Sequence, residues 1–171
     1  MNIKRLVMLV LVMFLMISVN SRAQVQAELT ELNVSGAYST ISQDGQSIYS
    51  MNLILSAGYF IWQYLEVGGD AGVTKMKDED TIGSVGPFVS FHYLFNEESK
   101  IVPFAGIQGG TTFGFDENIL YYGGFLGAKA FIGSGGGGAV SLQLFYLRHE
   151  PSKKTKPFDQ FGALTGISIF F

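Results

Sequence analysis

Ser90 and His92 come closer than any other pair in this chain to the spacing that nucleophilic catalysis requires. A serine nucleophile needs a base within hydrogen-bond reach, and residues two apart on a β-strand share one face of that strand. No carboxylate is recognisable as a third member of a triad, and His149 supplies the one other imidazole. We therefore assign no catalytic residue and predict that the chain is not an enzyme.

A second set of polar side chains stands within segments that are otherwise small or apolar. The set comprises Glu66, Asp70, His92, Gln108, Lys129 and Gln143. If the fold encloses them, a charge without a partner would be costly, so we expect them to form one network of ion pairs and hydrogen bonds. In particular, Lys129 should pair with Glu66 or Asp70. A path for protons or ions is the functional alternative.

Other site chemistries find little support in the sequence. Two histidines, no cysteine and no short His/Asp/Glu spacing argue against a metal site. The glycine run 133–138 lacks the Lys-Ser/Thr that follows a phosphate-binding loop, so we interpret it as a flexible turn. We accordingly predict no cofactor.

The first 23 residues predict a cleaved signal peptide. Lys4 and Arg5 precede an apolar stretch over 6–17, and Ser21 and Ala23 occupy the positions that a secretory peptidase reads. The expected domains are therefore a signal peptide over 1–23 and one mature domain over 24–171. Without Lys4, Arg5 and Arg22 the chain keeps 8 of its 11 Lys+Arg against 14 Asp+Glu. That acidic balance makes nucleic acid an unlikely partner.

The mature part is rich in glycine and aromatic residues and contains eight stretches of two-residue periodicity, which predict strands. They are 29–41, 48–60, 65–74, 81–95, 100–114, 120–133, 139–149 and 160–171. No linker or internal repeat separates them, so we expect a single unit.

The two faces of these strands meet different solvents. One face carries large apolar residues, as at Met51, Leu53 and Leu55, while the other carries Gly, Ser, Asn and Gln with few charges. A soluble barrel of the lipocalin type would carry Lys, Glu and Asp on its outer face, which meets water. The pattern therefore favours a barrel whose apolar face meets lipid. We expect that face to include Met51, Leu53, Leu55, Leu142, Leu144, Ile167 and Ile169.

An open sheet edge is not tolerated in lipid, so the first and last strands should pair. We predict an all-β, closed antiparallel eight-stranded up-and-down barrel, with aromatic residues near strand ends at the lipid boundaries. Eight strands enclose a space that side chains nearly fill. We expect glycines to make room for the inward rings of Phe88, Phe125 and Phe145. Pro87 and Pro103 should lie near strand ends or at bulges.

Several segments resemble the small bacterial outer-membrane β-barrels of the OmpA/OmpX type. They are Gly58-Tyr59-Phe60-Ile61, Leu65-Glu66-Val67-Gly68-Gly69, Pro103-Phe104-Ala105-Gly106 and the terminal Gly166–Phe171. The resemblance covers the whole mature chain and implies a bacterial outer-membrane location. It also implies recognition by the barrel-assembly machinery through the last strand, which ends in Phe171. The family has no shared catalytic residues to carry over, and we expect no peptidoglycan-binding C-terminal domain in this chain.

With periplasmic termini, the turns at 61–64, 96–99 and 134–138 face the periplasm, and the loops at 42–47, 75–80, 116–119 and 150–158 face outward. These outer loops are short, which argues against a large protein partner. We expect a monomer that contacts outer-membrane lipid and lipopolysaccharide, the latter through the lysines of 150–156. The expected role is structural or surface interaction around a side-chain-filled lumen. The alternatives are a lipid A acyl-modifying enzyme and a narrow channel for small solutes or protons.

We predict that the mature protein begins at Gln24. N-terminal sequencing of protein extracted from membrane fractions should return Gln24 as its first residue. An intact Met1 on the membrane-bound protein would contradict the signal-peptide assignment.

Overall fold

The computed structural model describes residues 27–43, 46–76, 81–93, 100–114, 118–132, 137–151 and 156–171. The predicted signal peptide lies outside them and stays a prediction. The described residues form eight strands: β1 (Thr30–Gln43), β2 (Gln46–Trp62), β3 (Leu65–Met76), β4 (Thr81–His92), β5 (Ile101–Phe113), β6 (Ile119–Ile132), β7 (Gly138–Pro151) and β8 (Phe158–Phe170). None of the described residues belongs to a helix that is long and apolar enough to cross a membrane.

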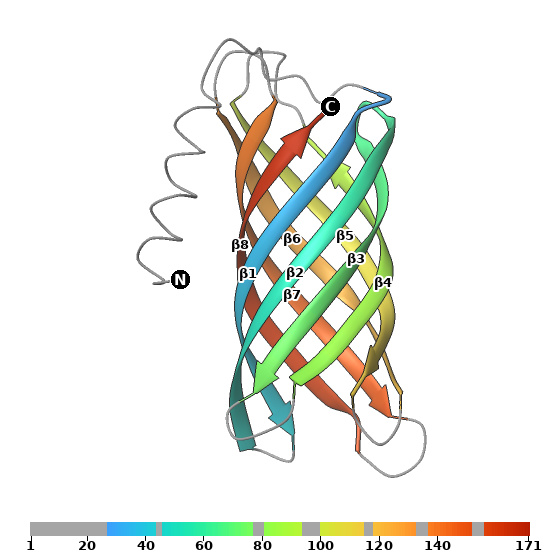
Figure 1. Ribbon diagram of the computed structural model, residues 1–171, viewed down its shortest axis with the longest axis vertical. Coiled ribbons are helices and arrows are strands. Elements are labelled where there is room, and N and C mark those ends of the chain that lie inside the picture. Colours follow the sequence, from blue (N-terminus) through green and yellow to red (C-terminus); the bar gives the residue numbers. More distant parts are fainter. Residues whose placement is uncertain are drawn as a thin grey trace.

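Each strand pairs antiparallel with the next, and β1 pairs with β8 from Glu31 against Phe170 to Ser42 against Asp159. The sheet is therefore a closed barrel, as predicted (Figure 1). We call the end with the start of β1 and the end of β8 the terminal end. The opposite end, with the β1–β2 connection, is the loop end.

Several strands extend beyond their predicted bounds. Gln43 pairs with Gln46, and β2 continues to Trp62 after a register shift between Phe60 and Trp62. The turns predicted over 42–47 and 61–64 are therefore shorter than expected. The predicted strands were ended where polar residues begin. Strand pairing, however, depends on backbone hydrogen bonds, which polar residues also make. In contrast, the strand predicted to reach Phe95 ends at His92.

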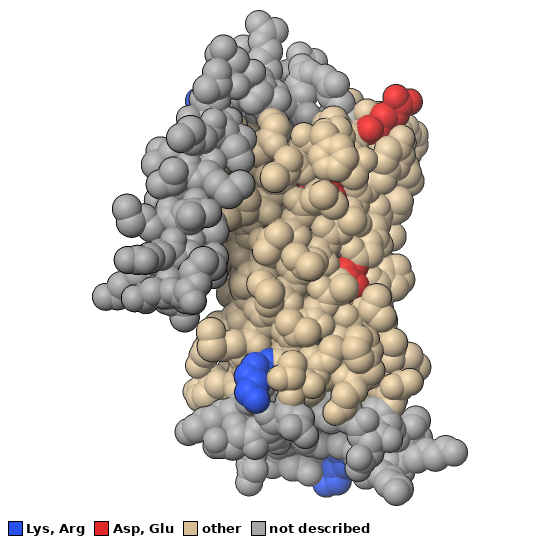
Figure 2. All heavy atoms as spheres, in the orientation of Figure 1, with Lys and Arg blue, Asp and Glu red and all other residues tan. Residues whose placement is uncertain are grey.

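The outer surface is apolar along the length of the strands. Met51 is 70 % exposed and Leu142 56 %, and most of the wall between the two ends carries no charge in the face shown in Figure 2. The remaining residues predicted to face lipid also point outward: Leu53, Leu55, Leu144, Ile167 and Ile169, with Ile167 half-buried. This confirms the predicted facing of the strands.

Exposed aromatic side chains lie near both ends of the barrel. Trp62, Tyr64 and Tyr93 lie at the terminal end, and Phe113 and Tyr122 at the loop end. These are the positions at which aromatic rings anchor a protein at a lipid–water boundary.

Inward rings lie over glycines of neighbouring strands. Phe88 pairs with Gly68, Phe125 with Gly106 and Phe145 with Gly162. A Cβ atom added to any of these glycines would approach the ring to 2.7 Å or less, at 2.5, 2.4 and 2.7 Å from the Cζ atoms. The predicted role of glycine in admitting these three rings is confirmed.

Pro87 does not lie where it was predicted. Pro103 is the third residue of β5, near a strand end as expected, but Pro87 is in the middle of β4. No register shift occurs there. Instead, the β4–β5 pairing stops at Val85 with Thr111 and resumes at Phe88 with Gln108. The ladder is thus interrupted at the point where proline has no N–H to donate.

We predict that Leu144→Arg destabilises the barrel by about 2–4 kcal/mol, because a charge in the middle of β7 would face the hydrocarbon core. Leu120→Arg, at the loop end of β6, is the matched control and should cost about 0–1 kcal/mol, because the penalty falls toward the interface. Equilibrium unfolding in lipid bilayers measures both. Equal costs at the two positions would contradict the depth assigned to Leu144.

Candidate functional site

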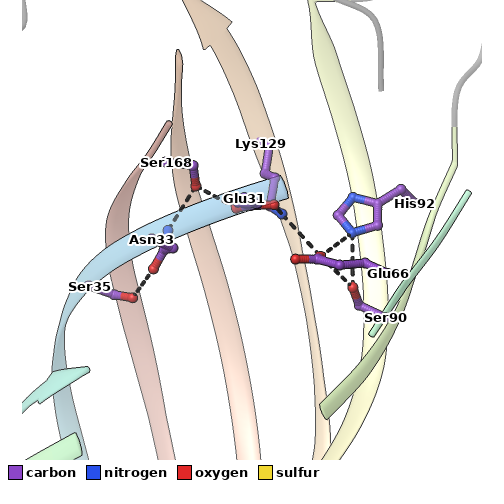
Figure 3. Close-up of polar contacts among 8 residues, drawn as sticks. All are labelled: Glu31, Asn33, Ser35, Glu66, Ser90, His92, Lys129 and Ser168. Carbon is purple, nitrogen blue, oxygen red and sulfur yellow. Dashed lines mark hydrogen bonds and ion pairs between the residues drawn. The ribbon is translucent and has the colours of Figure 1, made fainter. Parts of the chain in front are cut away.

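Lys129 is the centre of a buried polar cluster inside the terminal end of the barrel. Its Nζ donates to Glu31 Oε2 and lies 3.6 Å from Glu66 Oε2, and all three side chains are almost fully buried. The lysine comes from β6 and the carboxylates from β1 and β3, so the ion pairs span the lumen (Figure 3). Buried charges are tolerated when they are paired in this way.

Three aromatic rings surround the same ammonium group. Lys129 Nζ lies 5.1 Å from the ring centroid of Phe104, 5.8 Å from that of Phe170 and 6.0 Å from that of Phe60. These distances are within the range of cation–π attraction. The barrel therefore holds a buried ammonium between carboxylates and aromatic faces.

Ser90 and His92 join this cluster through Glu66. Ser90 Oγ donates to Glu66 Oε2 at 2.9 Å, and His92 Nε2 lies 2.9 Å from both of those oxygens. The third group that the sequence did not reveal is therefore present, which corrects that part of the sequence analysis. Glu66 is 26 residues from His92 in sequence, and only the β3–β4 pairing of Glu66 with Ser90 brings them together.

The arrangement differs from a catalytic triad. In a triad the serine meets one imidazole nitrogen and the carboxylate the other. Here both meet Nε2, while Nδ1 is buried without a hydrogen-bond partner. The Ser90 hydroxyl donates to the carboxylate, so in this arrangement its proton is directed to Glu66 and not to the imidazole.

Local sequence makes room for the cluster and extends it. A Cβ atom at Gly58 would lie 1.8 Å from Glu66 Oε1, so this position must be glycine for the carboxylate to keep its place. On the other side, Ser168 donates to Glu31 Oε1 at 2.6 Å and accepts from Asn33 at 2.9 Å. Ser35 in turn donates to Asn33.

On the terminal side of this cluster lies an apolar plug. It consists of Phe60, Val102, Phe131, Ala139 and Phe170, all buried and packed together. On the other side of the cluster, toward the loop end, lies a cavity of about 540 Å³. Glu31, Glu66 and Lys129 line this cavity, whereas no residue of the plug does. The polar cluster is therefore the floor of the cavity.

All six of the polar residues predicted to share a network lie inside the barrel, but in more than one place. Glu66, His92 and Lys129 belong to the polar cluster. Lys129 pairs with Glu66, one of the two partners predicted for it, whereas Asp70 accepts a hydrogen bond from Tyr121 Oη at 3.2 Å. Gln108 and Gln143 line the cavity.

Glu31 is the important residue that the sequence analysis missed. It alternates with Leu32, and the inward Asn33, Ser35 and Ala37 follow at two-residue spacing. That alternation was a usable signal for an inward carboxylate. No local pattern, however, relates Glu31 to a lysine 98 residues away.

A separate polar chain lies toward the loop end. His149 Nε2 lies 3.0 Å from Gln160 Oε1, and Gln160 donates to Ser39 at 2.8 Å. Ser39 lies 2.5 Å from Ser50 Oγ and accepts from Asn52 at 3.1 Å. Within the described part of the chain, no three His, Cys, Asp or Glu side chains are arranged to hold a metal ion.

Comparison with solved structures places the fold among known proteins. The chain is similar to Neisserial surface protein A, with a TM-score of 0.64 and 15 % identity over 82 % of this chain and 96 % of that one. It is also similar to Ail, the attachment invasion locus protein of Yersinia pestis, with a TM-score of 0.54 and 14 % identity over 85 % of this chain and all of that one. The chain has the fold of a bacterial outer-membrane β-barrel.

The outer membrane protein OprG from Pseudomonas aeruginosa shares this fold, with a TM-score of 0.53 and 11 % identity over 89 % of this chain and 99 % of that one. No family model matches the sequence. No curated protein matches it either. At these identities the likeness concerns the fold, so the site must be interpreted from its own geometry.

We predict that Lys129→Met destabilises the barrel by about 3–5 kcal/mol, because it leaves two buried carboxylates without their cation. Adding Glu31→Gln should recover part of that loss, with a coupling energy of about 0.5–3 kcal/mol. Unfolding free energies of the two single variants and the double variant measure the coupling.

The exposed pair of Arg148 and Asp159, whose atoms are 2.9 Å apart, provides the control. The cycle of Arg148→Met with Asp159→Asn should show a coupling of only about 0.2–1 kcal/mol. Strict additivity of the Lys129 and Glu31 substitutions would contradict the proposed energetic role of the buried pair.

Proposed function

We propose that this chain is a non-conducting, non-enzymatic barrel of the outer membrane, closed at its terminal end and with a structural or surface-interaction role. The observation that carries the proposal is the layered closure of the lumen. Ion pairs among Glu31, Lys129 and Glu66 span the barrel, and the apolar plug fills the lumen on the terminal side of them. An ion crossing these layers would have to break buried ion pairs and then enter an apolar cluster, and both steps are costly.

The lumen is not uniformly filled, in contrast to the interior expected from the sequence. Side chains fill the terminal end, but the cavity begins at the polar cluster. The reason is that many inward positions beyond the cluster carry small residues, such as Ser35, Ser56, Gly72 and Ser84. We therefore propose that the polar cluster and the apolar plug close the terminal end of the lumen. We call these two layers the closed floor, and the lumen beyond them is a cavity.

We propose that the terminal end faces the periplasm and that the loop end contacts lipopolysaccharide. The support is a set of exposed polar partners at the loop ends of β6, β7 and β8. Tyr122 donates to Glu150 at 2.8 Å, and Tyr146 donates to Asp159 at 2.9 Å, the same carboxylate that binds Arg148. Such amphipathic groups suit the level of lipid headgroups. Phe171, which is exposed after β8, is the proposed signal to the barrel-assembly machinery.

A lipid A-modifying enzyme is the second candidate, because Ser90, His92 and Glu66 are in contact. Two features count against it. The Ser90 hydroxyl donates to Glu66 and not to the imidazole of His92. All three residues are also buried in the lumen, away from the acyl chains outside the barrel. Mass spectrometry of lipid A from cells with and without the protein distinguishes the candidates. A changed acyl pattern that disappears in Ser90→Ala would favour the enzyme.

We predict that the purified barrel shows no steady conductance in planar lipid bilayers. The combined variant Phe60→Ala with Lys129→Ala removes one side chain from the plug and one from the polar cluster, and it should conduct. Arg148→Ala is the control, because it removes a cation outside the lumen and should stay closed. A steady current through the unchanged protein would contradict the closed floor.

A further inference from the structure

Asp70 is the one inward carboxylate of the described residues that does not belong to the polar cluster. It lies in the middle of β3, lines the cavity and accepts one hydrogen bond, from Tyr121 at 3.2 Å. Among the described residues no Lys, Arg or His nitrogen lies within ion-pair distance of it. Among the described residues Lys129 is the lysine that lies in the lumen, and it already forms ion pairs with Glu31 and Glu66.

An enclosed carboxylate without a cation is expensive to keep in a fold. Asparagine at the same position would accept the Tyr121 hydrogen bond without carrying a charge. A carboxylate in a cavity is therefore better explained by a ligand that supplies the missing positive charge.

The walls around Asp70 have an uneven composition. Strands β1 to β3 present small polar groups to the cavity, such as Asn33, Asn52 and Ser56. Strands β4 to β7 present polar groups such as Gln108 and Gln143 and, in addition, most of the rings: Phe88, Phe104, Tyr121, Phe125 and Phe145. Asp70 thus lies on the polar wall and is joined to the aromatic wall through the Tyr121 hydroxyl.

One aromatic residue contacts Asp70 through its hydroxyl, and the ring of another lies at the neighbouring inward position of β3. The Phe88 ring covers Gly68, which is the neighbouring inward position on β3. Tyr121 reaches Asp70 because Gly86 and Gly110 leave room for it. A Cβ atom at either glycine would lie 2.7 Å from the hydroxyl oxygen. The ring and the hydroxyl are thus held in place by the backbone around them.

The barrel already contains an example of the chemistry that such a site would use. The Lys129 ammonium is bound by a carboxylate with aromatic ring centroids at 5.1 to 6.0 Å. Asp70 offers a second carboxylate, which lines the same cavity as several aromatic rings, and no ammonium of the described residues pairs with it. Ring faces and a carboxylate together favour an organic ammonium over a neutral molecule of the same shape.

We propose that the cavity binds a small organic ammonium ion with an apolar body, and that Asp70 is its counter-ion. The ammonium would bind Asp70, and the apolar body would lie against the aromatic wall. A volume of about 540 Å³ is within the usual range of small-molecule sites. The inference rests on the proposed closed floor, which makes the cavity a binding site rather than a passage.

Calorimetric titration of the folded full-length mature barrel in detergent micelles tests the proposal, with phenethylammonium as the probe. The neutral 2-phenylethanol has a similar shape and controls for partition into the cavity. Empty micelles control for partition into detergent. The amine should bind saturably, and the alcohol at least tenfold more weakly. Because this comparison uses the unchanged protein, it does not depend on how a variant folds.

Asp70→Asn then identifies the counter-ion. It should weaken binding of the amine at least tenfold while leaving the unliganded barrel as stable as before or more so. Glu150→Gln is the matched control, because it removes a carboxylate outside the cavity and should leave affinity unchanged. Loss of stability in Asp70→Asn without a change in affinity would assign Asp70 a structural role and overturn the proposal. Equal binding of amine and alcohol would overturn it as well.

Conductance measured on the same preparation separates this inference from the proposed function. A closed barrel that does not bind the amine contradicts the ligand site alone. A barrel with steady conductance contradicts the closed floor, whatever its affinity for the amine.

Discussion

The pairing of β1 with β8 is the constraint on which the rest of the structure depends. In hydrocarbon no water is available to satisfy an open sheet edge, so a sheet can cross a membrane only when its first and last strands join. Once the sheet is closed, every residue points either toward lipid or into a narrow lumen. Large apolar residues such as Met51 and Leu142 fill the first role. Every charge that faces inward must then be satisfied within the barrel.

The consequences differ along the lumen. At the terminal end, Phe60, Val102 and Phe170 pack into a plug, and in the adjacent polar cluster Glu31 and Glu66 both pair with Lys129. Toward the loop end, small side chains on β1 to β3 face both rings and polar groups on β4 to β7, and the space between them stays open. A single barrel thus combines a packed floor with a cavity, because the sizes of its inward residues change from one end and one wall to the other.

The fold could be predicted from the sequence because strand alternation is local. The facing of Met51, of Leu144 and of the Phe125 ring each followed from a two-residue period that needs no knowledge of distant segments. Pro87 was misplaced because proline was expected only near strand ends or at bulges. It is tolerated in mid-strand since the β4–β5 ladder is interrupted beside it.

The candidate site could be predicted only in part. The two-residue alternation along the strands placed Glu66, Lys129 and Asp70 inside the barrel, but it did not show which of these side chains contact one another. Contacts across a lumen depend on strand tilt and stagger, which relate positions as distant as Glu31 and Lys129. The same limit hid the contact of Glu66 with Ser90 and His92, since that contact requires the register of β3 against β4.

The geometry of that last contact shows why residue types alone do not establish an activity. Serine, histidine and a carboxylate are all present within 2.9 Å of one another. Catalysis would require the carboxylate to orient one imidazole nitrogen while the other accepts the serine proton. Here the serine proton goes to Glu66, and Glu66 also binds Lys129. Glu66 therefore fits a role in neutralising the lysine, and Ser90 and His92 fit a role in holding that carboxylate in the floor of the lumen.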